Sequence, residues 1–258
     1  MSDVTVDEIR KYWNERAKKD MSAKSTTNDV YFRDIERRVI SEYIAKLKPN
    51  SVADLGCGDG RLLVTIATMH PDIKFYGYDY SDEMLKIALN LIQLKNLENV
   101  KLQLHNILNP IPGKFDLVYT VRCLINLPDW ELQKKSINNI YESLQQGGYY
   151  LMIENFIEGH DTFNNLRKKF NLPEIPVRKH NNYLSQKKLS EFMHDLFLLE
   201  FDVNISSLYY VVTRIIYSRL CADIGVEPDY FDPHHKYASL LPFCGEFGPI
   251  RFLVYRKK

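Results

Sequence analysis

The chain has 258 residues, 45% of them hydrophobic and 26% charged, which suffices for one domain with a full core and additional segments. Its net charge of +1 provides no basic surface for nucleic acid, and its four cysteines show neither a C-x-x-C pair nor metal-ligand spacing. Such cysteines are typical of free thiols in a reducing compartment. The acidic N-terminus is unlike a signal peptide, and no apolar run approaches the ~20 residues of a membrane span. We therefore expect a cytoplasmic protein without a membrane segment.

Two helices are predicted ahead of the first strand, in an N-terminal helical cap over residues 1–47. Thr5 and Glu8 have the spacing of a capping box, which predicts a helix through about Lys19. A second helix with regularly spaced apolar positions is expected from Val30 to Lys46.

Residues 51–62, S-V-A-D-L-G-C-G-D-G-R-L, organise the rest of the chain. An apolar run from Val52 to Leu55 predicts a short buried strand, and the apolar stretch from Leu62 can open a helix. Glycines at every second position between them permit a sharp turn and let a ligand approach the bare backbone. A second strand is expected from Ile73 to Tyr78, and Asp79 at its end can accept hydrogen bonds from both hydroxyls of a ribose.

This combination resembles the class I S-adenosylmethionine-dependent methyltransferases, whose first motif is (D/E)-x-G-x-G-x-G. Asp54, Gly56, Gly58 and Gly60 match that motif, and Asp79 stands in the place of the family's ribose acid. The resemblance is strong from Val52 to Asn155 and weak over the last two strands. It implies an α/β, doubly wound Rossmann-like fold with a seven-stranded sheet in the order 3-2-1-4-5-7-6 and an antiparallel last strand. It also implies S-adenosyl-L-methionine as cofactor and S-adenosyl-L-homocysteine as product.

The motif and the resemblance together predict a set of cofactor-binding residues: Asp54, Gly56, Cys57, Gly58, Gly60, Asp79, Tyr80, Met84, Asn106, Ile107 and Val121. In the family, a residue near Met84 often packs on the adenine. The family commonly has an acid at the place of Asn106, and an asparagine oxygen can accept the same bond from the adenine amino group.

The remaining elements follow in the order that the family implies, within one domain over residues 1–258 whose core spans 50–155. Helices are expected at 82–95, 130–145 and 185–197, and strands at 100–104, 115–121, 149–153, 200–205 and 252–255. Residues 156–184 and 206–248 lack strand alternation, and we interpret both as insertions that form the substrate pocket.

Substrate-binding residues are expected where the strands deliver side chains to one sheet edge and where the extra segments cover it. The candidates are Tyr12, Trp13, Arg33, Arg122, Asn126, Asn155 and Tyr209. Arg122 can pair with an anionic substrate group, and a salt bridge to a neighbouring carboxylate is an equally good interpretation. Core packing of the rings and a solvated Arg33 are the corresponding alternatives for the N-terminal residues.

A base is needed if the methyl acceptor is a hydroxyl, and the candidates are His160, His180 and Glu154, the last as base or substrate orienter. For each histidine, a surface or loop-packing role is the competing interpretation. His234 and His235 are adjacent and lack carboxylates at suitable spacing, so we predict no metal site.

The sequence thus predicts metal-free O- or N-methylation of a small polar or anionic metabolite or glycan precursor, by a monomer or homodimer. The (N/D)-P-P-(F/Y/W) motif of base N-methyltransferases is missing after the fourth strand, where Arg122 also replaces the acidic metal ligand of catechol-type enzymes. Alternatives are an RNA or protein methyltransferase, an NAD-dependent dehydrogenase, which the G-x-G-x-G spacing disfavours, and a binding module without catalysis.

Overall fold

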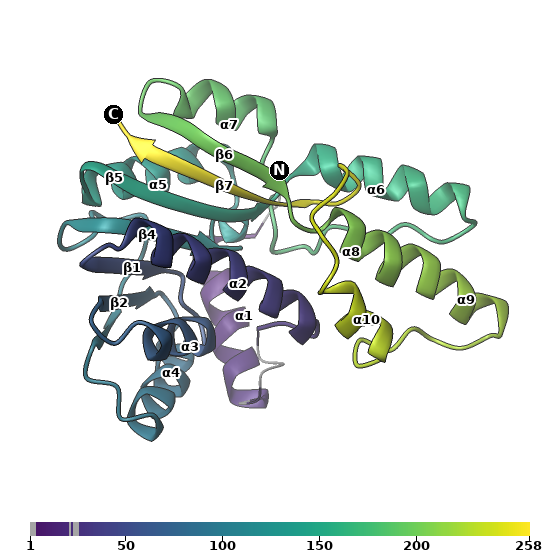
Figure 1. The fold of residues 1–258 in the computed structure, drawn as a ribbon, viewed down its shortest axis with the longest axis horizontal. Helices are drawn as coiled ribbons and strands as arrows, with labels where there is room; N and C mark the ends of the chain where they lie inside the picture. Colours follow the sequence, from purple (N-terminus) through teal and green to yellow (C-terminus); the bar gives the residue numbers. More distant parts are fainter. Residues whose placement is uncertain (1–3, 21, 23–25) are drawn as a thin grey trace.

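The computed structural model describes residues 4–20, 22 and 26–258. Within these residues the chain forms one seven-stranded sheet with helices on both faces (Figure 1). The strands are β1 (Ser51–Leu55), β2 (Lys74–Asp79), β3 (Val100–Leu104), β4 (Phe115–Val121), β5 (Leu144–Asn155), β6 (Phe197–Asn204) and β7 (Ile250–Lys257). Their order is β3-β2-β1-β4-β5-β7-β6, and β7 runs antiparallel to β5 and β6. The predicted fold class and strand order are confirmed.

Ten α-helices are found in the described ranges, together with a 3₁₀ turn and a π-helical turn. They are α1 (Val6–Lys19), α2 (Val30–Leu47), α3 (Arg61–Met69), α4 (Asp82–Leu94), η1 (Leu124–Asn126), α5 (Trp130–Ser143), α6 (Ile157–Lys169), α7 (Gln186–Met193), α8 (Ser207–Val211), η2 (Val212–Ile216), α9 (Tyr217–Asp223) and α10 (Pro233–Ala238). The capping box predicted at Thr5 is present: Thr5 Oγ1 accepts the Glu8 amide, and Glu8 accepts the Thr5 amide.

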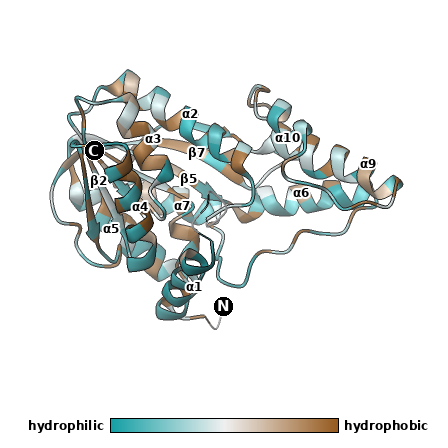
Figure 2. Cartoon of the chain, turned by 90° about the horizontal axis from the view of Figure 1, so that it is seen from below, coloured by the Kyte–Doolittle hydropathy of each residue, from teal (hydrophilic) through white to brown (hydrophobic). Residues whose placement is uncertain are grey.

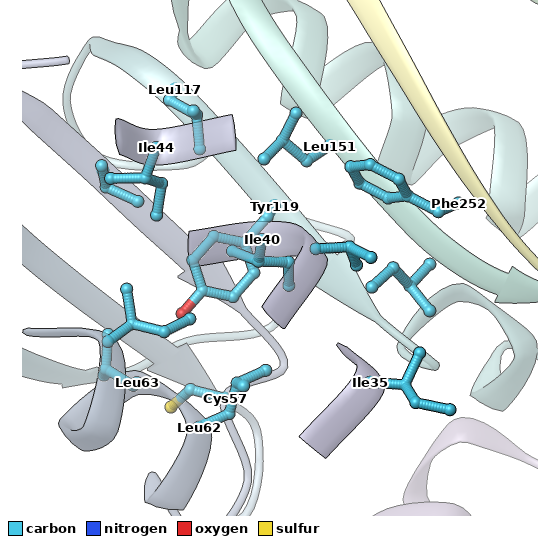
Figure 3. Packing of buried hydrophobic residues seen from close by; sticks show 14 of the residues in the cluster. Ile35, Ile40, Ile44, Cys57, Leu62, Leu63, Leu117, Tyr119, Leu151 and Phe252 are labelled. Atoms are coloured by element: carbon cyan, nitrogen blue, oxygen red, sulfur yellow. The ribbon is translucent and has the colours of Figure 1, made fainter. Parts of the chain in front are cut away.

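The hydrophobic core lies in two layers because successive residues of a strand face opposite sides of the sheet. Leu117, Tyr119, Leu151 and Phe252 face the layer formed by α2 and α3. Figure 3 shows these side chains in one cluster with Ile35, Ile40 and Ile44 of α2. Val118, Tyr150, Met152 and Leu253 face the other layer, with α5 and α7. The alternation therefore explains why the central strands are apolar throughout, as buried parallel strands are.

Both segments interpreted as insertions contain helices that the sequence analysis did not predict. Residues 156–184 hold α6, and residues 206–248 hold α8, η2, α9 and α10. Gly159, Asn164 and Asn165 are weak helix formers, so local propensity did not indicate α6. Tertiary packing favours the helix instead, since its Phe163 lies in a small buried cluster with Leu172 and Ile215 of η2. Figures 1 and 2 show α6 and α9 side by side, extending beyond the sheet.

Two helix ends also differ from the prediction. The helix expected over 130–145 ends at Ser143, because β5 begins at Leu144 and is longer than predicted. The helix expected to reach Phe197 ends at Met193, because Phe197 already begins β6 beside β7. In the described ranges no helix is both long and apolar enough to cross a membrane.

The packing of α2 on the sheet predicts a large stability loss when one of its core side chains is shortened. Ile40 is fully buried, so Ile40→Ala is expected to lower the free energy of unfolding by about 2–5 kcal/mol, measured by urea denaturation. Leu94 is 75% exposed, and Leu94→Ala should change stability by less than about 1 kcal/mol. Equal losses in the two variants would contradict the assignment of α2 to the core.

Candidate functional site

A cavity of about 210 Å³ opens at the carboxyl ends of β1, β2 and β4 and is bordered by residues of α1 and α2. The carboxyl ends of parallel strands share one edge of the sheet, so side chains from distant parts of the chain meet there. Of the residues predicted to bind a cofactor, all except Gly60 line this cavity. The substrate-binding candidates Trp13, Arg33, Arg122 and Asn126 line it as well, as does His180.

The glycine turn after β1 requires glycine for two separate reasons. Gly56, Gly58 and Gly60 all have positive φ angles, of 76°, 54° and 70°. A Cβ atom at Gly56 would lie 2.5 Å from Cys123 Sγ, and one at Gly60 would lie 2.5 Å from Ala88 Cβ. Gly60 therefore allows α3 to approach α4, while Gly58 keeps backbone exposed to the cavity.

Asp79 is held at the edge of the cavity by the backbone on both sides. The Gly58 amide donates to its Oδ2 and the Ser81 amide to its Oδ1, each at 2.7 Å. Burial nevertheless raises the pKa of Asp79, with the backbone hydrogen bonds opposing the shift. The carboxylate also lines the cavity, so a hydroxyl of a bound ligand can donate to it there.

Asp54 at the end of β1 is the second acid beside the glycine turn. Burial raises its pKa to about 8, although the Tyr119 hydroxyl donates to its Oδ2 at 2.8 Å and opposes the shift. Tyr119 itself is enclosed between α2 and α3 in the core (Figure 3). A positively charged ligand group in the cavity would favour the ionised form of Asp54.

The far side of the cavity, beyond Asp79, carries further predicted cofactor-binding residues, of which Met84 and Asn106 are the two predicted to contact the adenine. Tyr80, Met84, Asn106 and Ile107 all line it. Asn106 Oδ1 already accepts the Leu108 amide at 3.0 Å, which leaves this oxygen one further lone pair. Helix α1 closes this side, since Tyr80 donates to Asp7 Oδ1 at 3.0 Å and Arg10 lies over the Tyr80 ring.

Arg122 follows β4 and is paired with Glu36 of α2. Its Nε and Nη2 atoms lie 2.9 and 3.0 Å from the two Glu36 carboxylate oxygens. Glu36 is 1% exposed, and burial raises its pKa although Arg122 opposes the shift. Arg122 has a positive φ of 52°, a strained conformation for a side chain with a Cβ, and its amide donates to Ile153 O. Nη1 is not used by Glu36, so Arg122 makes the predicted salt bridge and keeps a donor for a ligand.

Trp13, Asn126 and His180, three residues predicted to act on the methyl acceptor, lie together in the cavity wall, and we call this part of the wall the acceptor end. Trp13 Nε1 donates to Asn126 Oδ1 at 3.3 Å, and Asn126 Nδ2 donates to the Arg122 carbonyl at 2.7 Å. Tyr12 does not line the cavity, and its ring stacks on His180 with centroids 4.2 Å apart. Burial, together with nearby Arg178 and Arg16, lowers the pKa of His180 to about 4, so His180 is neutral at pH 7.

Four further predicted site residues lie outside the cavity, and their positions correct the interpretation made from the sequence. Glu154 is fully buried: its Oε1 accepts the Cys123 and Leu124 amides at 2.9 Å, and its Oε2 accepts the Ile125 amide at 3.4 Å. Its carboxylate therefore orders the loop after β4 and is not placed to act as a base. Asn155 is buried next to it at the end of β5.

His160 and Tyr209 are the other two of these residues outside the cavity. His160 lies on α6, is 6% exposed, and packs against Asn164 and the edge of Tyr183. Tyr209 is buried, and its hydroxyl donates to Asp29 Oδ1 at 2.6 Å. Their neighbours are core and insertion residues, so the structure places neither side chain in the wall of this cavity.

Four charged residues in the described cavity wall were missed by the sequence analysis: Arg10, Glu36, Asp59 and Arg178. Asp59 lies within the glycine turn and has Arg33 Nη1 3.5 Å from its Oδ1, while Glu36 is paired with Arg122. The place of Asp59 in the G-D-G turn and the helical spacing of Glu36 from Arg33 were the available signals. Arg178 comes from a segment without periodicity, and nothing local indicated it. Within the described ranges, no three or more His, Cys, Asp or Glu residues are grouped to hold a metal ion.

Residues 47–194, more than half of the chain, match a family model described as a methyltransferase domain. Among curated proteins, the carboxy-S-adenosyl-L-methionine synthase of Campylobacter fetus is 28% identical over 166 residues, which cover 63% of this chain and 65% of that protein. An uncharacterized methyltransferase of Bacillus subtilis is 29% identical over 100 residues, covering 38% of this chain and 52% of that protein. The chain thus matches only part of the length of these relatives.

Solved structures share the fold over nearly the whole chain. The magnesium protoporphyrin IX methyltransferase from Synechocystis, solved with bound S-adenosylhomocysteine, has a TM-score of 0.63 at 15% identity and covers 97% of this chain and 98% of its own. An N-methyltransferase from Bradyrhizobium japonicum, also in complex with S-adenosylhomocysteine, has a TM-score of 0.54 at 10% identity, covering 95% and 98%. At these identities the likeness shows the fold alone.

The Arg122–Glu36 pair predicts that removing one partner costs more stability than removing both charges. Arg122→Gln leaves a buried carboxylate without its cation, which is expected to cost about 3–5 kcal/mol in the free energy of unfolding at pH 7.5. The double variant Glu36→Gln, Arg122→Gln should recover part of that loss, as measured by urea denaturation. A double variant that is less stable than Arg122→Gln would contradict the buried pair.

The raised pKa of Glu154 predicts that the free energy of unfolding decreases as the pH rises. Burial raises its pKa from 4.5 to about 7, against the three backbone amides that bind the carboxylate. The folded state therefore favours the protonated form, and the resulting stabilisation is complete below pH 4.5 and lost as the pH rises through 7. Between pH 4.5 and 8, wild type should lose about 3 kcal/mol of unfolding free energy relative to Glu154→Gln. Thermal or urea unfolding of both proteins across this range measures it, and a constant difference would refute the shift.

Proposed function

Because the chain belongs to the class I S-adenosylmethionine-dependent methyltransferases, we propose that it transfers a methyl group from S-adenosylmethionine to a small polar or anionic metabolite. The proposal rests on one observation: Asp54, the glycine turn and Asp79 surround a single cavity, and the acceptor-side residues Trp13, Arg122 and Asn126 line that same cavity. Cofactor and acceptor sites are therefore contiguous, as direct transfer between them requires.

The electrostatics of the cofactor side support a cationic ligand. Asp54 and Asp79 are acids whose pKa values burial has raised, so both gain when a positive charge enters the cavity. S-adenosylmethionine carries a sulfonium and an ammonium group, whereas the pyrophosphate of NAD would bring negative charge toward these acids and Asp59. The charge pattern is thus a second argument, in addition to the G-x-G-x-G spacing, against an NAD-dependent dehydrogenase.

When bound, S-adenosylmethionine supplies an electrophilic methyl group, and the residues of this chain have to bind, orient and shield the reactants. In our proposal Asp79 accepts hydrogen bonds from the ribose, and Met84 and Ile107 contact the adenine. Trp13 and Asn126 position the acceptor, since they are joined to each other and to the Arg122 backbone. Helix α1 reduces water access on the side of Tyr80.

A small acceptor is favoured over RNA or protein by the charge and the enclosure of the site. The chain has a net charge of only +1, and α1 covers the cavity that a macromolecular substrate would have to enter. Arg33, which could otherwise contact a phosphate backbone, is paired with Asp59.

Calorimetric titration tests the cofactor assignment directly. S-adenosylmethionine and S-adenosylhomocysteine should both bind, and NAD should not. Asp79→Ala should weaken binding about ten- to a hundredfold, because it removes an acceptor of charge-assisted hydrogen bonds. Asp72→Ala is the matched control, since Asp72 is exposed just before the opposite end of β2 and should bind like wild type.

Three results would count against the proposal. They are binding of NAD in preference to the sulfur compounds, failure of wild type to bind either sulfur compound, and equal affinities of Asp79→Ala and wild type.

A further inference from the structure

Two arginines line the acceptor end of the cavity, and each has guanidinium N–H donors that are not paired with a carboxylate in the described residues. Arg178 lines the cavity and is exposed, and no ion pair joins it to an acid within the described residues. It lies close enough to His180 and Tyr183 to influence the pKa of both. Arg122 is 26% exposed, and its Nη1 remains available while Glu36 holds Nε and Nη2. Two guanidinium groups in one cavity wall favour an acceptor that carries an anionic oxygen pair.

The carboxyl groups in the described cavity wall already have partners. Asp79 accepts two backbone amides, Asp54 accepts the Tyr119 hydroxyl, and Glu36 accepts Arg122. Asp59 is near Arg33 and Arg61. A carboxylate held by a cation or by backbone amides is a poor base for an acceptor hydroxyl.

His180 is the candidate base that the structure does bring to the cavity, and its surroundings do not suit proton removal. Its ring stacks on Tyr12 and meets the edge of Trp13 at 5.8 Å. Arg178 is close by and disfavours a second positive charge, which is consistent with a pKa lowered to about 4. An imidazole of that pKa binds a proton too weakly to activate a neutral alcohol efficiently.

We infer that the methyl acceptor is itself a carboxylate, positioned by Arg178 and Arg122, and that the product is a methyl ester. The inference rests on the function proposed above. One carboxylate oxygen forms the new C–O bond to the methyl carbon while the C–S bond breaks and its electron pair goes to sulfur. The sulfonium becomes a neutral thioether, the carboxylate becomes a neutral ester, and no proton is transferred. A carboxylate is already ionised at pH 7, so the reaction needs no enzyme base.

The same arrangement disfavours the other acceptor classes. An amine acceptor would be cationic at pH 7 and would be repelled by Arg122 and Arg178. A hydroxyl acceptor needs a base, and the acids of the described wall already have partners. The histidines of this wall are His180 and His105, and His105 follows β3 next to Asn106, with its Nε2 3.4 Å from Asn109 O and its ring against the edge of Tyr78. The positive charge of the two arginines and the absence of a proton to remove therefore both favour a carboxylate acceptor.

The chemical stability of the product tests the inference for any acceptor. The protein is incubated with methyl-labelled S-adenosylmethionine and either an ultrafiltrate of yeast extract or a matched set of benzoate, benzyl alcohol and benzylamine. Label carried by a methyl ester is released as volatile methanol by mild alkali, whereas label in an ether, a methylamine or a methyl phosphate is retained. We expect alkali-volatile label, and transfer to benzoate but not to its alcohol or amine counterpart where that set reacts.

Alkali-stable label, or no transfer by a protein that binds S-adenosylmethionine, would overturn the carboxylate assignment and leave cofactor binding intact. Loss of S-adenosylmethionine binding in the calorimetric titration would instead refute the proposed function itself. The two failures are thus distinguished by the binding measurement.

Substitution of Arg178 tests its part in recognition. With the acceptor fraction that yields alkali-volatile label, Arg178→Gln should raise KM for the acceptor about ten- to a hundredfold with a much smaller change in kcat. Arg178→Lys should restore part of the loss, and S-adenosylmethionine affinity should be unchanged in both variants. Arg256→Gln is the control, since Arg256 is an exposed arginine of β7 that does not line the cavity and whose Nε lies 3.0 Å from Glu200 Oε1. An unchanged KM in Arg178→Gln would contradict the assignment of this residue.

Discussion

One charged face of α2 joins the parts of the molecule that form the site. Asp29 caps the helix and pairs with Arg214 of η2, Arg33 lies near Asp59 of the glycine turn, and Glu36 pairs with Arg122 after β4. These three residues recur at helical spacing, so they project from neighbouring positions of the same helix. Asp29, Asp59 and Glu36 are buried, so the charge of each is stabilised by its partner. These pairs connect one helix to η2, to the glycine turn and to the loop after β4.

Different elements of the fold supply the two sides of the cavity. The sheet edge supplies Asp54 and Asp79, whose positions follow from β1 and β2 and from backbone hydrogen bonds. The N-terminal helices supply the opposite wall and complete the acceptor end through Trp13. Glu154, at the base of this end, accepts three amides of the loop that carries Asn126. This loop is therefore ordered by a buried acid that does not line the cavity. Glu154, predicted as a base or substrate orienter, holds the backbone of the loop that carries Asn126.

The predictions made from the sequence agree with the structure where the residues concerned lie within a short stretch of the chain. The strand, the glycine turn and the acid at the end of the second strand lie close together in the chain, and Asp54, Gly56, Gly58 and Asp79 all line one cavity. They were less successful in the insertions. Helix α6 contains weak helix formers and is stabilised by contacts with η2, which lies far away in the chain. His160 and Tyr209 have suitable chemistry for a site, but the helices that carry them turn both side chains into packed surroundings.

The sequence by itself determined the order of strands and helices in the core, the cofactor motif and the presence of a sheet edge where polar residues gather. These properties follow from short-range periodicity and from a motif contained in a few consecutive positions. Only the tertiary structure decided which charges are paired and which remain available to an acceptor. The sequence singled out Arg122 and gave no indication of Arg178, whereas the fold pairs Arg122 with Glu36 through two of its nitrogens and places Arg178 in the same cavity wall. Pairing of this kind depends on how α2 packs against the sheet, and no local spacing encodes that distance.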